Sequence, residues 1–173
     1  MSPISKTVSF SIGSAFKTPG HTFESTTFNI ENKVLLTGDT LFTNGVGRPD
    51  LKADTDERVP RHDALRQGVV EKSKLLFQSL QKLLTLEDET IIFPSHTSQP
   101  IEFDNIPINT TLGKVKSIPI LQLSENDFIE SILSRIPPTP ANYLTIVEKN
   151  LQGDFSDINP IDLEAGANRC AIS

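Results

Sequence analysis

Residues 18–42, TPGHTFESTTFNIENKVLLTGDTLF, contain the pattern that decides the fold of this chain. Apolar and β-branched side chains alternate from Thr26 to Ile30, and a compact apolar run follows at residues 34–37. The intervening residues 31–33 offer a tight turn, so the segment predicts a β-hairpin.

A strand–helix–strand unit follows from the second hairpin strand. An apolar stripe at helical spacing predicts a helix from about His62 to Thr85, and residues 91–93 predict a short buried strand. Strands joined by a crossover helix are parallel, so this strand should run parallel to the one at residues 34–37. An earlier strand is expected at Phe10, Ile12 and Phe16, which makes the fold mixed α/β.

The rest of the chain shows a less regular pattern of apolar residues. Residues 43–61 carry no periodicity and are expected to form a long functional loop. Residues 97–123 are expected to be irregular because prolines interrupt them. Helices are predicted from Ser124 to Ile136 and over residues 141–150, and the tail from residue 153 on reads as loop.

The composition of the chain excludes several classes of function. The chain has 173 residues, 36% hydrophobic and 22% charged, which fits one domain with a real core. A net charge of −6 argues against nucleic acid as a partner. No apolar run is long enough to cross a bilayer, and the single cysteine gives no intrachain disulfide, so a cytoplasmic, non-membrane protein is expected.

Three candidate metal ligands should meet at one edge of the sheet. His21 precedes the first hairpin strand and Asp39 follows the second, so both lie at the same end of the hairpin. The ends of the two parallel strands coincide, which brings His96 beside Asp39. Each residue alone is more often structural, surface-exposed or turn-forming, but three of them together, two imidazoles and a carboxylate, suit Zn²⁺ or Fe²⁺. His62, at a helix start, is expected to be a solvated or capping residue.

Three motifs carry a family resemblance: TPGHT at 18–22, TGDTLF at 37–42 and GRPDL at 47–51. With them the chain resembles the metallo-β-lactamase superfamily, and within it the persulfide dioxygenase and glyoxalase II branch. Pro94-Ser95-His96 stands where that branch carries a similar histidine segment. The resemblance implies an α/β fold of two packed mixed sheets flanked by helices, an αββα sandwich.

The resemblance also implies a metal and a reaction. In persulfide dioxygenases one Fe²⁺ is held by two histidines and an aspartate; His21 and Asp39 match two of these ligands, with His96 nearby. The implied reaction is oxidation of glutathione persulfide, or a related thiol substrate, by O₂ to sulfite and glutathione. In glyoxalase II-like enzymes, which hydrolyse thioesters with Zn²⁺, the positions of His21 and His96 bind metal and that of Asp39 bridges two ions. Thr40, Arg48 and Asp50 are expected to support the ligands, the last two as an ion pair bracing the Asp39 loop or as a plain surface pair.

One departure from the family pattern is large. The His-x-His-x-Asp-His motif belongs upstream of TPGHT, but the 20 residues before His21 contain no histidine. Residues 1–173 are therefore expected to be a partial domain, with a core at 8–123 and a helical region and tail at 124–173. The N-terminal half of the sandwich would be absent.

Two consequences are expected from that missing half. The metal site would lack one ligand, so that the chain alone binds metal weakly or not at all and is inactive.

One face of the sheet would also be uncovered. A second copy of the chain or a separate N-terminal half could cover this face by pairing with it. The third functional hypothesis is therefore a non-catalytic pairing module. The residues expected on that face are Phe10, Phe28, Ile30, Leu35 and Ile92.

Overall fold

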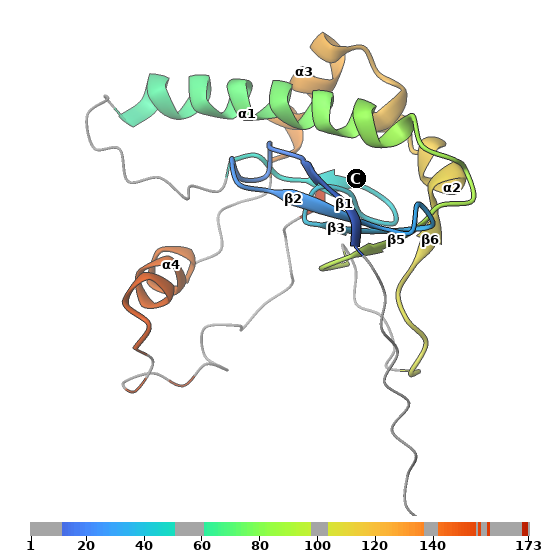
Figure 1. Ribbon diagram of the computed structural model, residues 1–173. Helices are drawn as coiled ribbons and strands as arrows, with labels where there is room; N and C mark the ends of the chain where they lie inside the picture. Colours follow the sequence, from blue (N-terminus) through green and yellow to red (C-terminus); the bar gives the residue numbers. More distant parts are fainter. Residues whose placement is uncertain are drawn as a thin grey trace, which may run out of the picture.

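The computed structural model describes residues 12–50, 61–97, 104–136, 142–154, 156, 159 and 171–172. Its main feature is a five-stranded sheet of order β1-β2-β3-β5-β6, and two short strands, β4 and β7, form a second sheet (Figure 1). In chain order the elements are β1 (Ile12–Lys17), β2 (Thr26–Ile30), β3 (Val34–Gly38), β4 (Val46–Gly47), α1 (Arg61–Leu84), β5 (Ile91–Pro94), β6 (Thr110–Thr111), α2 (Leu112–Lys116), the 3₁₀ helix η1 (Pro119–Gln122), α3 (Glu125–Arg135), α4 (Tyr143–Gln152) and β7 (Ala171–Ile172).

The predicted hairpin is confirmed. Strands β2 and β3 pair antiparallel, with Phe28 opposite Leu36. Between the strands, Glu31 and Asn32 have φ angles of 52° and 56°, the left-handed conformation that matches the twist of a tight hairpin. The side-chain amide of Asn29 donates to the Asn32 side-chain oxygen at 2.8 Å. The turn thus fixes the hairpin register.

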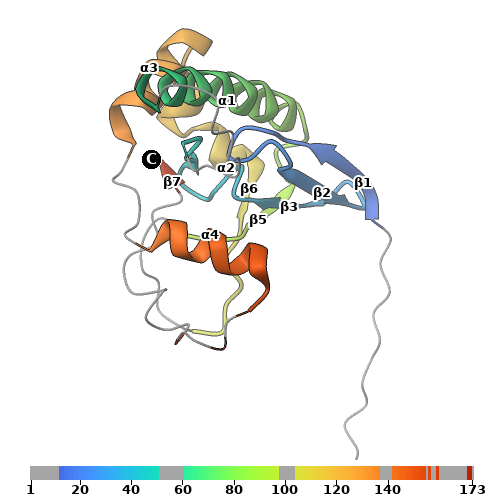
Figure 2. The same cartoon turned by 90° about the vertical axis from the view of Figure 1, so that its left-hand side faces the viewer.

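The predicted crossover is confirmed as well. Strands β3 and β5 are parallel, and α1 connects them with ends within one residue of those predicted. Figure 1 shows α1 along one face of the sheet with α3 beside it, and Figure 2 shows α4 on the opposite side. The rings of Phe77 and Phe128 join α1 to α3, with centroids 5.4 Å apart. Leu76, Leu80 and Leu83 of α1 are fully buried.

The hydrophobic core lies between the sheet and α1. Leu35 and Ile92 are fully buried in the same cluster as the α1 leucines, so the expectation that they line a bare sheet face is wrong. Successive residues of a strand point to opposite faces. Phe28 and Leu36, each 40% exposed, therefore lie on the far sheet face, which points away from α1.

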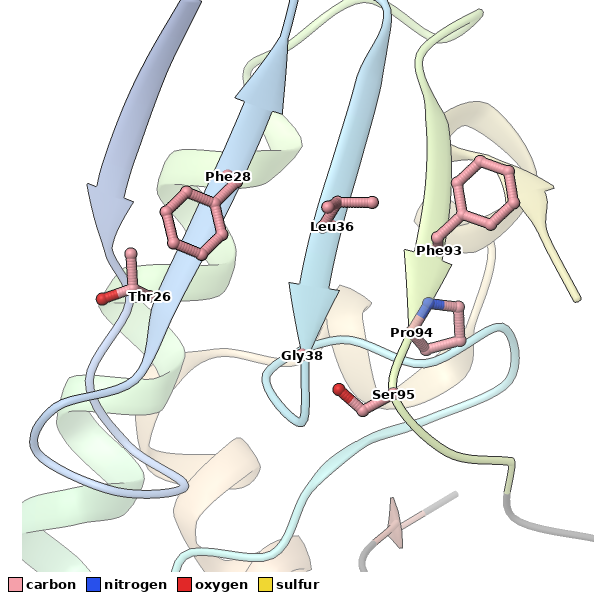
Figure 3. A pocket seen from close by; sticks show the side chains of 7 residues that line it. All are labelled: Thr26, Phe28, Leu36, Gly38, Phe93, Pro94 and Ser95. Atoms are coloured by element: carbon pink, nitrogen blue, oxygen red, sulfur yellow. The ribbon is translucent and has the colours of Figure 1, made fainter. Parts of the chain in front are cut away.

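The far sheet face, defined by Thr26, Phe28, Leu36 and Phe93, carries a shallow hollow of about 310 Å³ (Figure 3). The residues that line it are mostly apolar: Thr26, Phe28, Leu36, Gly38, Phe93, Pro94 and Ser95. Ile30, also expected on a bare face, is half-buried, and Phe10 lies outside the described residues. Apolar side chains gathered on an exposed face typically mark a contact surface.

Segments predicted to be irregular contain short elements. The described part of residues 97–123 holds β6, α2 and η1, of two, five and four residues. They bury Leu112, Val115, Ile120 and Leu121. Residues 171–172 of the predicted loop-like tail form β7 and pair with β4, which lies inside the segment 43–61. Elements this short produce no periodic signal, and the partner of a two-residue strand cannot be predicted from either segment.

The two predicted C-terminal helices are confirmed as α3 and α4. Ser124 caps α3, its Oγ accepting the Asp127 N–H at 3.3 Å. In the described part of the chain, every helix is too short or too polar to cross a membrane.

Candidate metal centre

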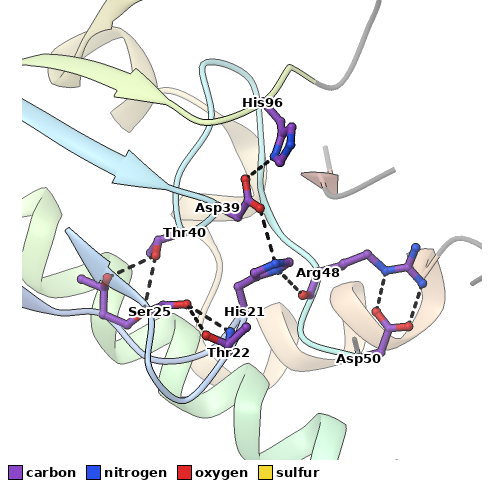
Figure 4. A network of polar contacts seen from close by, with 9 residues as sticks. His21, Thr22, Ser25, Asp39, Thr40, Arg48, Asp50 and His96 are labelled. Carbon is purple, nitrogen blue, oxygen red and sulfur yellow. Dashed lines mark hydrogen bonds and ion pairs between the residues drawn. The ribbon is translucent and has the colours of Figure 1, made fainter. Parts of the chain in front are cut away.

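The three predicted ligands lie together where β3 and β5 end (Figure 4). His21 Nε2 is 3.5 Å from one carboxylate oxygen of Asp39, and His96 Nδ1 is 2.6 Å from the other. The predicted juxtaposition is present, whereas the role of these residues as metal ligands stays a prediction.

His21 is held in the form in which histidine binds metals. Its Nδ1 lies 2.8 Å from the backbone carbonyl of Arg48, which can only accept a hydrogen bond. This contact assigns the proton to Nδ1 and leaves Nε2 with a free electron pair on the side of Asp39. The side chain is buried, and burial lowers the pKa of His21 below its usual 6.5, although the Asp39 carboxylate opposes the shift. At neutral pH the ring is therefore uncharged.

Asp39 is placed by a tight turn at the end of β3. Gly38 has a φ of 55°, which favours glycine, and the Thr40 N–H donates to the Thr37 carbonyl at 3.1 Å. The Thr37 hydroxyl closes the turn by donating to the Leu41 carbonyl at 2.7 Å. The turn directs the two oxygens of Asp39 toward two different histidines.

His96 reaches Asp39 from β5. The Ser95 N–H donates to the Gly38 carbonyl at 3.2 Å, which ties the end of β5 to the end of β3. The His96 side chain is 43% exposed, so it forms the solvent side of the cluster.

Of the three residues expected to support the ligands, Thr40 contacts neighbouring loop residues. Its hydroxyl lies 3.2 Å from that of Thr18, which in turn lies 3.1 Å from the Thr27 hydroxyl. All three threonines are buried. This chain of hydroxyls links the loop before His21 to the loop after Asp39.

Arg48 and Asp50 form a bidentate ion pair, with Nε–Oδ1 at 2.8 Å and Nη2–Oδ2 at 2.7 Å. Arg48 is fully buried, so the pair is more than a surface contact. One contact of this segment with the cluster is that of the Arg48 backbone carbonyl with His21. His62 is the second residue of α1, and its side chain lies outside the described residues.

Helix α1 supports the His21 loop in a way that the sequence did not reveal. The Ser79 hydroxyl donates to the Pro19 carbonyl at 2.8 Å. Gly20 packs so closely on α1 that a Cβ there would overlap the Leu76 backbone. Ser79 is a polar residue three positions after Leu76 on the buried stripe, and a buried hydroxyl at such a position signals a specific hydrogen-bond partner.

The donor set fits part of a metal shell. Neutral His21 and the Asp39 carboxylate supply two donors suited to Fe²⁺ or Zn²⁺. His96 directs its Nδ1 at Asp39 instead of at a common centre. Among the residues that the structure describes, no three His, Cys, Asp or Glu side chains are placed to hold one ion together.

Comparisons by sequence find uncharacterized relatives and no matching family. No protein-family model matches the chain. The chain is similar in sequence to the uncharacterized protein Rv2581c of Mycobacterium tuberculosis (strain H37Rv), 34% identical over 85 residues, and to ML0493 of Mycobacterium leprae, 37% identical over 81. These matches span 46% of this chain but only 31% and 30% of the relatives.

Among solved structures, the chain matches a metallo-β-lactamase from Staphylococcus aureus subsp. aureus COL. The TM-score is 0.62 at 25% identity, over 81% of this chain and 41% of that one. The chain therefore has a metallo-β-lactamase-like fold, and it spans less than half the length of the proteins that it matches.

Proposed function

We propose that His21 and Asp39 are metal ligands and that this chain carries at least part of the metal centre of a metallo-β-lactamase-fold enzyme. The observation that carries this proposal is the contact of His21 Nδ1 with the Arg48 carbonyl at 2.8 Å. Histidine ligands of metals typically donate their other ring N–H to such a carbonyl, which fixes the ring and its tautomer.

His96 is the third donor in this proposal. It already lies against Asp39, and its partial exposure lets the ring turn. To bind the same ion it would have to release its hydrogen bond to Asp39. A ligand from a second polypeptide is the other source of a third donor, since three protein ligands are usual for a catalytic metal.

For the reaction, we propose oxidation of glutathione persulfide by O₂, as the resemblance of GRPDL at 47–51 to persulfide dioxygenases implies. The outer sulfur loses four electrons, O₂ accepts them, and one water supplies the third oxygen of sulfite, leaving glutathione. Bound Fe²⁺ would supply open coordination positions for this chemistry. The residues of the chain hold the site: Arg48 orients His21, and the Gly38 turn orients Asp39.

A zinc-dependent hydrolase of glutathione thioesters is the second candidate. The observation in its favour is the orientation of Asp39, whose two oxygens face different histidines, as a carboxylate bridging two ions would. In this alternative His96 serves a second ion.

The test is metal binding by the purified chain, measured anaerobically with Fe²⁺ and separately with Zn²⁺. With His96 as the third donor we expect one equivalent to bind, in contrast to the weak or absent binding expected from the sequence, and we expect His21→Ala and Asp39→Asn to abolish binding, while the control His62→Ala retains it. O₂ uptake with glutathione persulfide would then support the first reaction, and hydrolysis of S-lactoylglutathione the second. Binding no stronger than that of His21→Ala would overturn the metal proposal and favour a non-catalytic pairing module.

A further inference from the structure

We propose that strand β7 is a positioning element for the His21–Asp39 pair, an inference that rests on the metal centre proposed above. Strand β7 acts through β4, with which it pairs, and through the residue that follows β4.

The backbone at Gly47 packs closely against both candidate ligands, His21 and Asp39. A Cβ at Gly47 would overlap the Asp39 carbonyl oxygen and lie 3.2 Å from the His21 Cβ. The Gly47 N–H donates to the Thr40 carbonyl at 3.3 Å, and the next residue, Arg48, supplies the carbonyl on His21 Nδ1. A small displacement of this segment would therefore change the position of both ligand residues.

Strand β7 holds that segment in place. Ile172 pairs with Val46, and Ala171 pairs with Gly47. The Ile172 side chain is only 2% exposed and belongs to the same hydrophobic cluster as Val46. Strand β4 has only two residues. In the described part of the chain it pairs with β7, and an isolated bridge joins its Val46 to Leu41.

A matched pair of isoleucines separates positioning from general stability. Ile172 and Ile120 are each 2% exposed and lie in the same cluster, but Ile120 belongs to η1. Both Ile172→Ala and Ile120→Ala should lower the thermal midpoint, because each removes buried methylene groups. If either variant fails to fold, Ile172→Val and Ile120→Val make the same comparison.

Two readouts on the full chain decide the question. The first is the ¹⁵N spectrum of the His21 imidazole without metal, assigned with His21→Ala. The second is affinity for Fe²⁺ or Zn²⁺. We expect only the Ile172 variant to shift the His21 Nδ1 resonance and to weaken metal binding by about tenfold or more.

Equal effects of the Ile172 and Ile120 variants on both readouts would overturn the positioning proposal. If the wild-type chain binds no metal, the proposed metal centre fails, and the imidazole spectrum alone decides whether β7 positions His21.

Discussion

His21 and the loop before it are contacted by two segments that are far from it in sequence. The Arg48 carbonyl binds its Nδ1, and α1 supports the preceding loop through Leu76 and Ser79. These contacts exclude water from most of the ring, and the resulting loss of solvation disfavours the charged imidazolium. The same burial that prepares His21 for a metal thus makes its protonation costly for the fold.

Acid should therefore destabilise the metal-free chain through His21. The pKa of His21 is lowered in the folded chain, so below the ordinary value of 6.5 the unfolded chain binds more protons. The stability contributed by neutral His21 is complete above about pH 6.5 and is lost as the pH falls toward the folded-state pKa.

Urea denaturation between pH 7.5 and 5, in a chelator, measures this contribution. We expect the unfolding free energy of the wild-type chain to fall more steeply on acidification than that of His21→Gln. Identical slopes for the two proteins would show that His21 carries no such penalty.

At the scale of elements, Gly68 of helix α1 is a position where the sequence is not optimal for stability. Gly68 lies inside the helix, and a Cβ there would meet nothing within 4 Å among the described atoms. Gly68→Ala should stabilise the chain by about 0.5–1 kcal/mol, because alanine loses less backbone entropy than glycine on folding.

Urea denaturation of Gly68→Ala and of a control, Gly113→Ala, checks this prediction. Gly113 is also helical, but its added Cβ would lie 3.0 Å from the Asp88 Cβ, so no gain is expected. Equal changes in the two variants would contradict the argument.

The elements also show which features the sequence could predict. The hairpin, α1 and β5 have clear periodicity and turn signals, and from their order the meeting of His21, Asp39 and His96 followed. The pairing of β4 with β7 and the contact of Ser79 with Pro19 depend on residues far apart in sequence. The prediction that Leu35 and Ile92 line an exposed sheet face was wrong. Each lies in a run of consecutive apolar residues, and without alternation such a run does not show which side chains point to the core.

For the whole molecule, the far sheet face is the feature with the largest expected effect in solution. Phe28 and Leu36 are exposed there, and their burial against another surface would be favourable at about 25 cal/mol per Å². We expect the purified chain to self-associate as its concentration rises, since a second copy is the partner always present in such a sample.

Two adjacent leucines test this expectation. Leu35 is fully buried and Leu36 is 40% exposed, on opposite faces of β3. Leu35→Ala should cost about 2–5 kcal/mol of stability. Leu36→Ala should cost less than about 1 kcal/mol, because much of that side chain already contacts solvent. In sedimentation velocity, Leu36→Ala should also weaken self-association. If Leu36→Ala sediments like the wild-type chain across the concentration range, then the far sheet face does not mediate self-association.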